Sequence, residues 1–210
     1  MKTRLSIIGL LQVLVASHCL ASSGEQSLLF EDFESISAPA LPAGWVVLNP
    51  GLDDGRWQTH TYNGVTWGVL SMRFRSSSVA PADDWFFTTP VNLAGGIPCR
   101  VRYWVKRSGS GPPLNLEVVA GTAANPAAMT QVVNPLHPVT SSSYLEEIGS
   151  FAPPTPGPYY IGFHVAGPPA AGRLFVDEVD VRIPETTLRL ALGLSRQLDL
   201  LPLVFGPNDT

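Results

Sequence analysis

Alternation of apolar and polar residues predicts a half-buried β-strand over residues 99–106. The apolar positions are Cys99, Val101, Tyr103 and Val105, and the positions between them are Arg100, Arg102, Trp104 and Lys106. Successive side chains of a strand point to opposite faces, so the first set lies on one face and the second set on the other. One face of this strand is therefore expected to join a core and the other to meet water.

Similar short apolar runs recur along the chain, and glycine- and proline-containing segments separate them. The further expected strands cover residues 28–33, 45–48, 57–61, 85–88, 114–119, 159–165 and 174–181. Strands at this spacing, without helical patterns between them, predict an antiparallel β-sandwich. Strands 28–33 and 45–48 are the first candidates to pair with each other.

The run 174–181 carries a carboxylate where a core residue is expected. Strict alternation places Asp177 on the same face as Phe175 and Val179. An unpaired buried carboxylate costs several kcal/mol, so such a residue usually faces a cation or hydrogen-bond donors. The pattern indicates an ion site, and the alternative is that Asp177 accepts hydrogen bonds from turn amides or pairs with an arginine.

Composition bounds the class of protein. The chain has 210 residues, of which 45% are hydrophobic and 14% charged, which suits one well-packed core, or a core with an appendage. The formal net charge is −4, and the Lys and Arg residues are spread along the sequence without a dense run. A nucleic-acid partner is therefore not expected.

The N-terminus has the three parts of a secretory signal peptide. Lys2 and Arg4 precede an apolar run over residues 5–16, and small residues follow it, so we expect cleavage after Ala21. The run is short for a membrane span of about 20 residues, and His18 disfavours the alternative of lipidation at Cys19. The predicted domains are a signal peptide (1–21), a sandwich (22–183) and a C-terminal extension of unknown role (184–210). The mature protein is expected to be secreted or at the cell surface, with no membrane span.

Candidate catalytic chemistry is sparse. Cleavage would leave one cysteine, Cys99, which cannot form an internal disulfide and is expected to be a core residue. The sequence contains no nucleophile elbow, zinc-protease helix motif or phosphate-binding glycine loop. The pairs Asp53–Asp54 and Asp83–Asp84 could serve a glycosidase, but adjacent acids in loops are more often turn formers or ligands.

Aromatic residues suggest binding surfaces as well as core. Trp45, Trp57 and Trp85 stand among apolar neighbours and are expected to be buried. Two other pairs are candidates for an exposed ligand-binding patch: Trp104 with Arg102, and Tyr62 with Trp67. Flat aromatic rings stack on sugars, so a glycan is one plausible class of ligand.

Five motifs in order resemble the cleaved-adhesin, or choice-of-anchor J, family of secreted bacterial domains. They are Phe30-Glu31-Asp32-Phe33-Glu34, Leu41-Pro42-Ala43-Gly44-Trp45, Asp83-Asp84-Trp85 with Thr89-Pro90-Val91-Asn92-Leu93, Tyr160-Ile161-Gly162-Phe163-His164, and Leu174-Phe175-Val176-Asp177-Glu178-Val179. The resemblance spans nearly the whole mature chain. It implies a single all-β domain, an antiparallel jelly-roll β-sandwich related to MAM and carbohydrate-binding modules.

The resemblance also implies a structural calcium ion that links the first and last strands. Carried over by position, Glu34 and Asp177 would be ligands, with Asp32 as a third, whereas Glu178 stands where a second Asp is frequent. Calcium takes six to eight oxygen ligands, so carboxylates, carbonyls and water together would satisfy it. Zinc is a weaker candidate, because His60, His137 and His164 are far apart in sequence.

These observations favour a secreted, non-catalytic binding or adhesion module with a calcium site, which recognises a glycan or a protein at a surface. A carbohydrate-active accessory or hydrolytic protein is the alternative, and a purely structural module is a third possibility.

Overall fold

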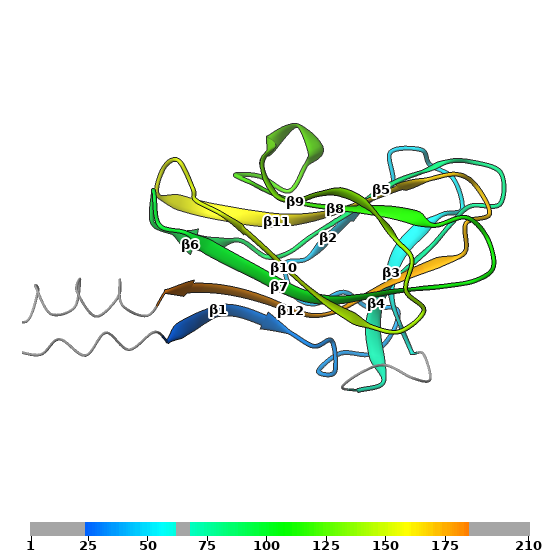
Figure 1. Cartoon of the computed structure of the whole chain (residues 1–210), viewed down its shortest axis with the longest axis horizontal. Coiled ribbons are helices and arrows are strands. Elements are labelled where there is room, and N and C mark those ends of the chain that lie inside the picture. The colour runs from blue at the N-terminus through cyan, green and yellow to red at the C-terminus, as the bar shows by residue number, and fades with distance from the viewer. Residues whose placement is uncertain (1–23, 62–67, 185–210) are drawn as a thin grey trace, which may run out of the picture.

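The computed structural model describes residues 24–61 and 68–184, which form two six-stranded antiparallel sheets (Figure 1). The first sheet has the order β10 (Leu145–Phe151), β7 (Cys99–Ser108), β12 (Arg173–Pro184), β4 (Leu70–Arg75) and β3 (Arg56–Thr61), and β1 (Glu25–Glu31) pairs with β12. The second sheet has the order β2 (Val46–Leu48), β5 (Ala82–Phe87), β11 (Gly157–Gly167), β8 (Leu114–Gly121) and β9 (Met129–Val139), and β6 (Val91–Leu93) pairs with β11.

A 3-10 turn, η1 (Pro126–Ala128), is the only helical element in the described ranges. None of the described segments is an apolar helix long enough to cross a membrane. The predicted signal peptide (1–21), the extension beyond Pro184, and Tyr62 with Trp67 lie outside the described residues.

The core lies between the two sheets and confirms the alternation predicted for residues 99–106. The side chains of Cys99, Val101 and Tyr103 are fully buried there. Tyr103 meets Phe163 of the second sheet edge-on, with ring centroids 5.2 Å apart, and Phe163 stacks on Phe86 at 4.4 Å. Aromatic contacts of this kind add about 0.5–1.5 kcal/mol each beyond the burial of apolar area. The predicted jelly-roll sandwich is therefore the fold of the chain.

The predicted pairing of strands 28–33 and 45–48 is wrong. β1 pairs with β12 in the first sheet, whereas β2 pairs with β5 in the second. The long link over residues 32–45 lets the chain cross from one sheet to the other, so neighbours in sequence need not pair. Four strands were not expected from the sequence pattern: β4, β6, β9 and β10.

A β-bulge in β12 changes which residues face the core. Asp177 lies opposite Trp104, and the next paired residue, Asp180, lies opposite Arg102, so two residues of β12 stand against one residue of β7 and one residue is extra. Glu178 in the bulge has a φ of 46°, in the left-handed region. The expected sharing of a face by Asp177 and Val179 is wrong, because the bulge keeps Val179 in the core and leaves Asp177 on the outer face.

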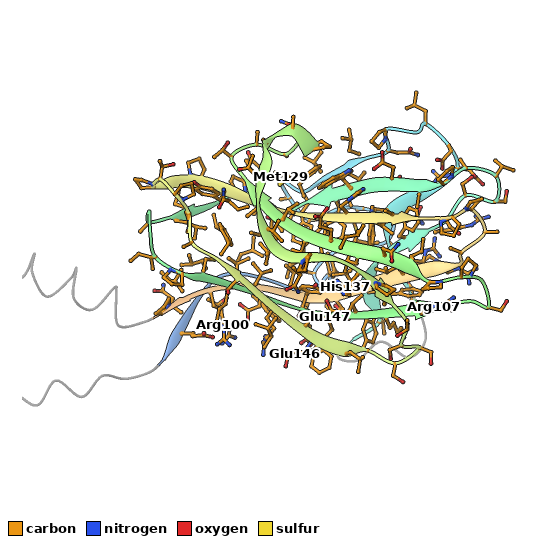
Figure 2. The ribbon with its side chains drawn as sticks, turned by 45° about the horizontal axis from the view of Figure 1, so that its top comes forward. Arg100, Arg107, Met129, His137, Glu146 and Glu147 are labelled. Carbon is orange, nitrogen blue, oxygen red and sulfur yellow. The ribbon has the colours of Figure 1, made fainter. Side chains whose placement is uncertain are left out.

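Polar contacts join β9 of the second sheet to β10 and β7 of the first. Figure 2 shows His137 of β9 beside Glu147 of β10. The Tyr103 hydroxyl donates to Oε2 of Glu147 at 2.6 Å and accepts from the Asn134 amide at 2.9 Å. His137 Nε2 lies 3.0 Å from the other oxygen of Glu147. Burial, followed by the nearby charge of Glu147, raises the pKa of Tyr103. The network therefore links the two sheets, and the buried Tyr103 hydroxyl has hydrogen-bond partners within it.

Candidate functional site

The outer face of the first sheet carries three of the candidate site residues. Directly paired residues of neighbouring strands share a face. Trp104 of β7 lies opposite Asp177 of β12 and Glu146 of β10, and Arg102 lies opposite Asp180. The outer face thus carries Arg102 and Trp104, predicted as a ligand-binding pair, together with Asp177, predicted as a metal ligand.

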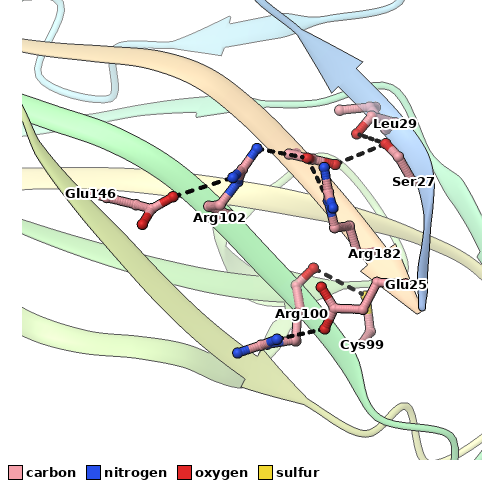
Figure 3. Close-up of polar contacts among 9 residues, drawn as sticks. Glu25, Ser27, Leu29, Cys99, Arg100, Arg102, Glu146 and Arg182 are labelled. Atoms are coloured by element: carbon pink, nitrogen blue, oxygen red, sulfur yellow. Dashed lines mark hydrogen bonds and ion pairs between the residues drawn. The ribbon is translucent and has the colours of Figure 1, made fainter. Parts of the chain in front are cut away.

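Arg102 is engaged in a polar network of the fold (Figure 3). Its Nη2 lies 3.2 Å from Asp180 and its Nη1 lies 3.3 Å from Glu146. The fully buried Asp180 also accepts hydrogen bonds from Arg182 at 2.6 Å and from the Ser27 hydroxyl at 2.8 Å. Removing one partner of a buried charge is strongly destabilising, so Arg102 has a structural task here. Trp104, its predicted partner in ligand binding, is half-buried on the same face.

Asp177 is almost entirely buried, with 2% of its surface exposed. Burial raises the pKa of Asp177 to about 7. The Glu178 amide donates a hydrogen bond of 2.9 Å to Asp177 Oδ1, which lowers the pKa, whereas the negative charges of Glu178, Glu34 and Asp32 raise it further. The structure therefore brings Asp32, Glu34 and Asp177 close enough to interact electrostatically, although 143 positions separate Glu34 from Asp177 in the sequence.

Hydrogen bonds within the fold occupy part of this carboxylate cluster. Glu34 Oε1 accepts from the amides of Val69 and Leu70, both at 2.8 Å, and Asp32 Oδ1 accepts from the Glu34 amide at 3.1 Å. As the side chains lie over residues 24–61 and 68–184, no three from His, Cys, Asp or Glu are grouped as metal ligands, so a cation here would also need backbone carbonyls and water. The oxygens not used in these bonds, together with backbone carbonyls and water, are the donors that a hard cation such as calcium prefers.

Four arginines lie together on the outer face beside β12, and the sequence pattern did not predict this group. Arg75 of β4 lies directly opposite Arg56 of β3 and Arg173 of β12, and Arg73 lies two residues along β4 on the same face. Within the described ranges, the arginines that form ion pairs are Arg100, Arg102 and Arg182, and none of the four arginines beside β12 forms one. We call Arg56, Arg73, Arg75 and Arg173 the arginine cluster.

Buried polar atoms without partners lie next to the arginine cluster. Three of the buried side-chain atoms that have no hydrogen-bond partner among the described residues are His60 Nδ1, Ser71 Oγ and Arg73 Nε; Asp84 Oδ1 and Arg102 Nε are others. His60 and Ser71 are directly paired across β3 and β4, and Arg73 is the next residue of β4 on that face. Burial, and then the charge of Arg73, lowers the pKa of His60. Unpartnered buried polar groups are rare in folded proteins, so these three mark a place where a polar ligand could be held.

Two of the four acids considered for a glycosidase, Asp53 and Asp83, are hydrogen-bonded or ion-paired within the fold. Asp53 Oδ1 accepts a hydrogen bond of 2.5 Å from the Gly55 amide, as expected of a turn former. Asp83 Oδ1 lies 2.8 Å from His164 Nε2, and the His164 ring stacks on Trp85 with centroids 4.1 Å apart. Asp84 is 1% exposed, and burial raises its pKa to about 6. Trp85 is buried as expected, but it packs with Phe87 in a small second cluster rather than in the main core.

No protein-family model matches the chain, and no curated protein matches it. Solved structures do resemble it. The K1 cleaved adhesin domain of Lys-gingipain from Porphyromonas gingivalis W83 superposes with a TM-score of 0.61 at 16% identity, covering 73% of this chain and 96% of that one. The K3 cleaved adhesin domain of the same protein gives 0.61 at 16% identity, covering 76% and 99%.

A carbohydrate-binding module has a similar fold. The CBM22-1 xylan-binding domain of Paenibacillus barcinonensis Xyn10C gives a TM-score of 0.54 at 15% identity, covering 78% of this chain and 98% of that one. At such identities the likeness establishes the fold alone. The chain therefore has a cleaved-adhesin-like jelly-roll fold, the architecture that its five sequence motifs had indicated.

Proposed function

We propose that the chain is a non-catalytic binding module that recognises a glycan through the outer face of its first sheet. The observation that carries the proposal is the row of unpartnered buried polar atoms formed by His60 Nδ1, Ser71 Oγ and Arg73 Nε. A site that binds sugar hydroxyls needs donors and acceptors that the fold itself does not use. Two of the similar structures are adhesin domains and one is a xylan-binding domain, which agrees with this class of function.

Trp104 is the aromatic residue that would complete the site. It is half-buried on the same face, on β7, and lies opposite Asp177 of β12. An aromatic ring beside polar donors is the usual composition of a small-molecule site, because the ring supplies apolar contact and the donors fix orientation. Arg102, which is held by Asp180 and Glu146, would position this part of the face rather than contact the ligand.

We also propose that a calcium ion is held near Asp177, with Glu34 and Asp32 contributing oxygens. The charges that act on the buried Asp177 come from Glu178, Glu34 and Asp32, which all have the same sign, and a cation would offset them. The ion would join the segment after β1 to the bulge of β12. Its role would be structural, and it would support the edge of the proposed binding face.

Export through the predicted signal peptide fits a module of this kind, and we propose that the mature chain works outside the cell or at its surface. N-terminal sequencing of exported protein should begin at Ser22. Retention of Met1 on the exported protein would contradict the assignment, and a lipid mass on Cys19 would indicate anchoring instead.

A glycan array probed with the purified chain tests the proposed function. Binding should weaken at least about tenfold in Ser71→Ala and Trp104→Ala, because each removes a contact on the proposed face. His137→Gln, on β9 of the other sheet, is the matched control and should bind as the wild type does. Hydrolysis of a bound glycan, lost on replacement of Asp83 or Asp84, would instead establish the alternative of a glycoside hydrolase.

A further inference from the structure

The arginine cluster places like charges directly against one another. Arg56, Arg75 and Arg173 occupy paired positions on three neighbouring strands, about 4.7–4.9 Å apart from strand to strand. Like charges in directly opposite positions of a sheet destabilise it. The chain as a whole has a net charge of −4, so carboxylates are not scarce, yet none forms an ion pair with these arginines among the described residues.

A preformed hollow lies at the end of the cluster. It has a volume of about 210 Å³ and is lined by Arg75, Ser76, Ser78, Ala170, Gly172 and Arg173. Ser76 Oγ donates to the Gly172 carbonyl and accepts from the Gly172 amide, both at 3.0 Å, and the Ala170 amide donates to the Ser77 carbonyl at 2.7 Å. Pockets for drug-sized ligands measure about 300–1,000 Å³, so this smaller hollow suits one group of a longer ligand.

Arg73 extends the cluster along β4 away from the hollow. Its Nε is buried without a hydrogen-bond partner. Burial, then the charges of Arg173 and Arg75, lowers its pKa, which means that the folded protein disfavours the positive charge that Arg73 carries. A guanidinium can bind a carboxylate or sulfate through two parallel hydrogen bonds, and a bound anion would remove both the repulsion and the unsatisfied donor.

We infer that the ligand of the proposed glycan site is an acidic polysaccharide, whose carboxylate or sulfate groups bind to Arg73, Arg75 and Arg173. The inference rests on the proposed function and narrows its ligand. The arginine cluster spans only three strands, β3, β4 and β12, which suits the binding of one or two charged groups on a sugar chain. A nucleic-acid site would need a longer basic tract that matches many phosphates.

The experiment compares binding of the purified chain to polygalacturonate, dextran sulfate, uncharged dextran and duplex DNA. We expect binding to one or both acidic polysaccharides, with little binding to dextran or DNA, and the two acidic probes distinguish carboxylate from sulfate. Raising NaCl from about 0.05 to about 0.5 M should weaken the binding, because exposed charges are screened.

Variants locate the site. Arg75→Gln and Arg173→Gln should each weaken binding about tenfold, which corresponds to one charge-assisted hydrogen bond. Asp54→Asn should strengthen binding, since Asp54 feels the charges of Arg75 and Arg56 from the margin of the cluster. Arg100→Gln is the matched control: Arg100 lies on the outer face of the same sheet but pairs with Glu25 at 2.5 Å (Figure 3), so binding should not change.

The outcomes separate this inference from the proposed function. Equal binding to dextran and to the acidic polysaccharides, or binding that is unchanged in both arginine variants, would overturn the acidic ligand and leave a glycan site standing. Binding of DNA as tight as that of the acidic polysaccharides would also overturn it. Failure to bind any glycan, on these probes and on the array, would overturn both. Thermal unfolding of each variant establishes that the arginine substitutions leave the fold intact.

Discussion

Arg75 of β4 lies directly opposite Arg173 of β12, and no carboxylate of the described residues forms an ion pair with either. Such an arrangement lowers stability, and we propose that it is kept for ligand binding. Arg173→Glu should therefore raise the free energy of unfolding by up to about 1 kcal/mol, because repulsion becomes attraction at an exposed site. The same variant should lose binding of acidic polysaccharide. Urea denaturation and a binding assay measure the two effects.

Arg173→Gln separates the two contributions. It removes the repulsion without adding an attraction, so its gain in stability should be smaller than that of Arg173→Glu. A loss of stability in both variants, with binding retained, would show that the arginines serve the fold instead.

Glu178 adopts a left-handed backbone conformation inside the bulge of β12, with φ at 46°. Such a conformation costs a residue with a side chain of order 1 kcal/mol, and more for a β-branched residue, whereas glycine adopts it readily. Glu178→Gly should therefore leave stability unchanged or slightly raised, and Glu178→Val should lower it by about 1–3 kcal/mol. Chemical denaturation of both variants tests this. Equal free energies of unfolding for the Gly and Val variants would show that the left-handed conformation at position 178 imposes no strain.

Calcium should raise the melting temperature of the wild-type chain if the proposed ion is bound. At about twenty times the dissociation constant, linkage gives roughly 1.8 kcal/mol of added stability, which a chelator should remove. Asp177→Asn keeps the shape of the side chain and deletes its charge, so it should abolish the calcium response. A response that persists unchanged in this variant would show that Asp177 is not a ligand.

His137 gives stability a defined dependence on pH. Burial alone would lower its pKa, but hydrogen bonding to the Pro135 carbonyl and to Glu147, whose charge also acts on it, outweighs burial and raises the pKa above 6.5. Because the folded-state pKa is the higher one, the contribution is fully present below pH 6.5 and disappears as the pH rises through the folded-state value. The stability difference between wild type and His137→Gln should therefore be larger at pH 5.5 than at pH 8.5. The effect should stay below about 1 kcal/mol, because the pair is partly exposed. A difference that grows with pH would contradict this account.

The local alternation of apolar and polar residues was sufficient to predict the β-sandwich and much of its core. The alternation at residues 99–106 predicted both faces of β7, and Trp45, Trp57 and Trp85 are buried as expected. Burial of one face imposes a period of two on a strand, and this period can be read without knowing which strand is its neighbour. The sequence motifs likewise indicated the jelly-roll architecture.

Strand neighbours and side-chain positions near the bulge were decided by the tertiary structure. Strict alternation assigned Asp177 to the same face as Val179, but the left-handed backbone of Glu178 places the two side chains on opposite faces. A glycine at position 178 would have indicated a positive φ, whereas a glutamate does not. The arginine cluster is a matter of register. Arg56, Arg75 and Arg173 look scattered along the sequence, and they meet because long-range antiparallel pairing brings β3, β4 and β12 side by side. The sequence by itself determined the period of each strand, whereas the candidate binding face depends on which strands pair and in which register, since that is set by packing across the whole sandwich.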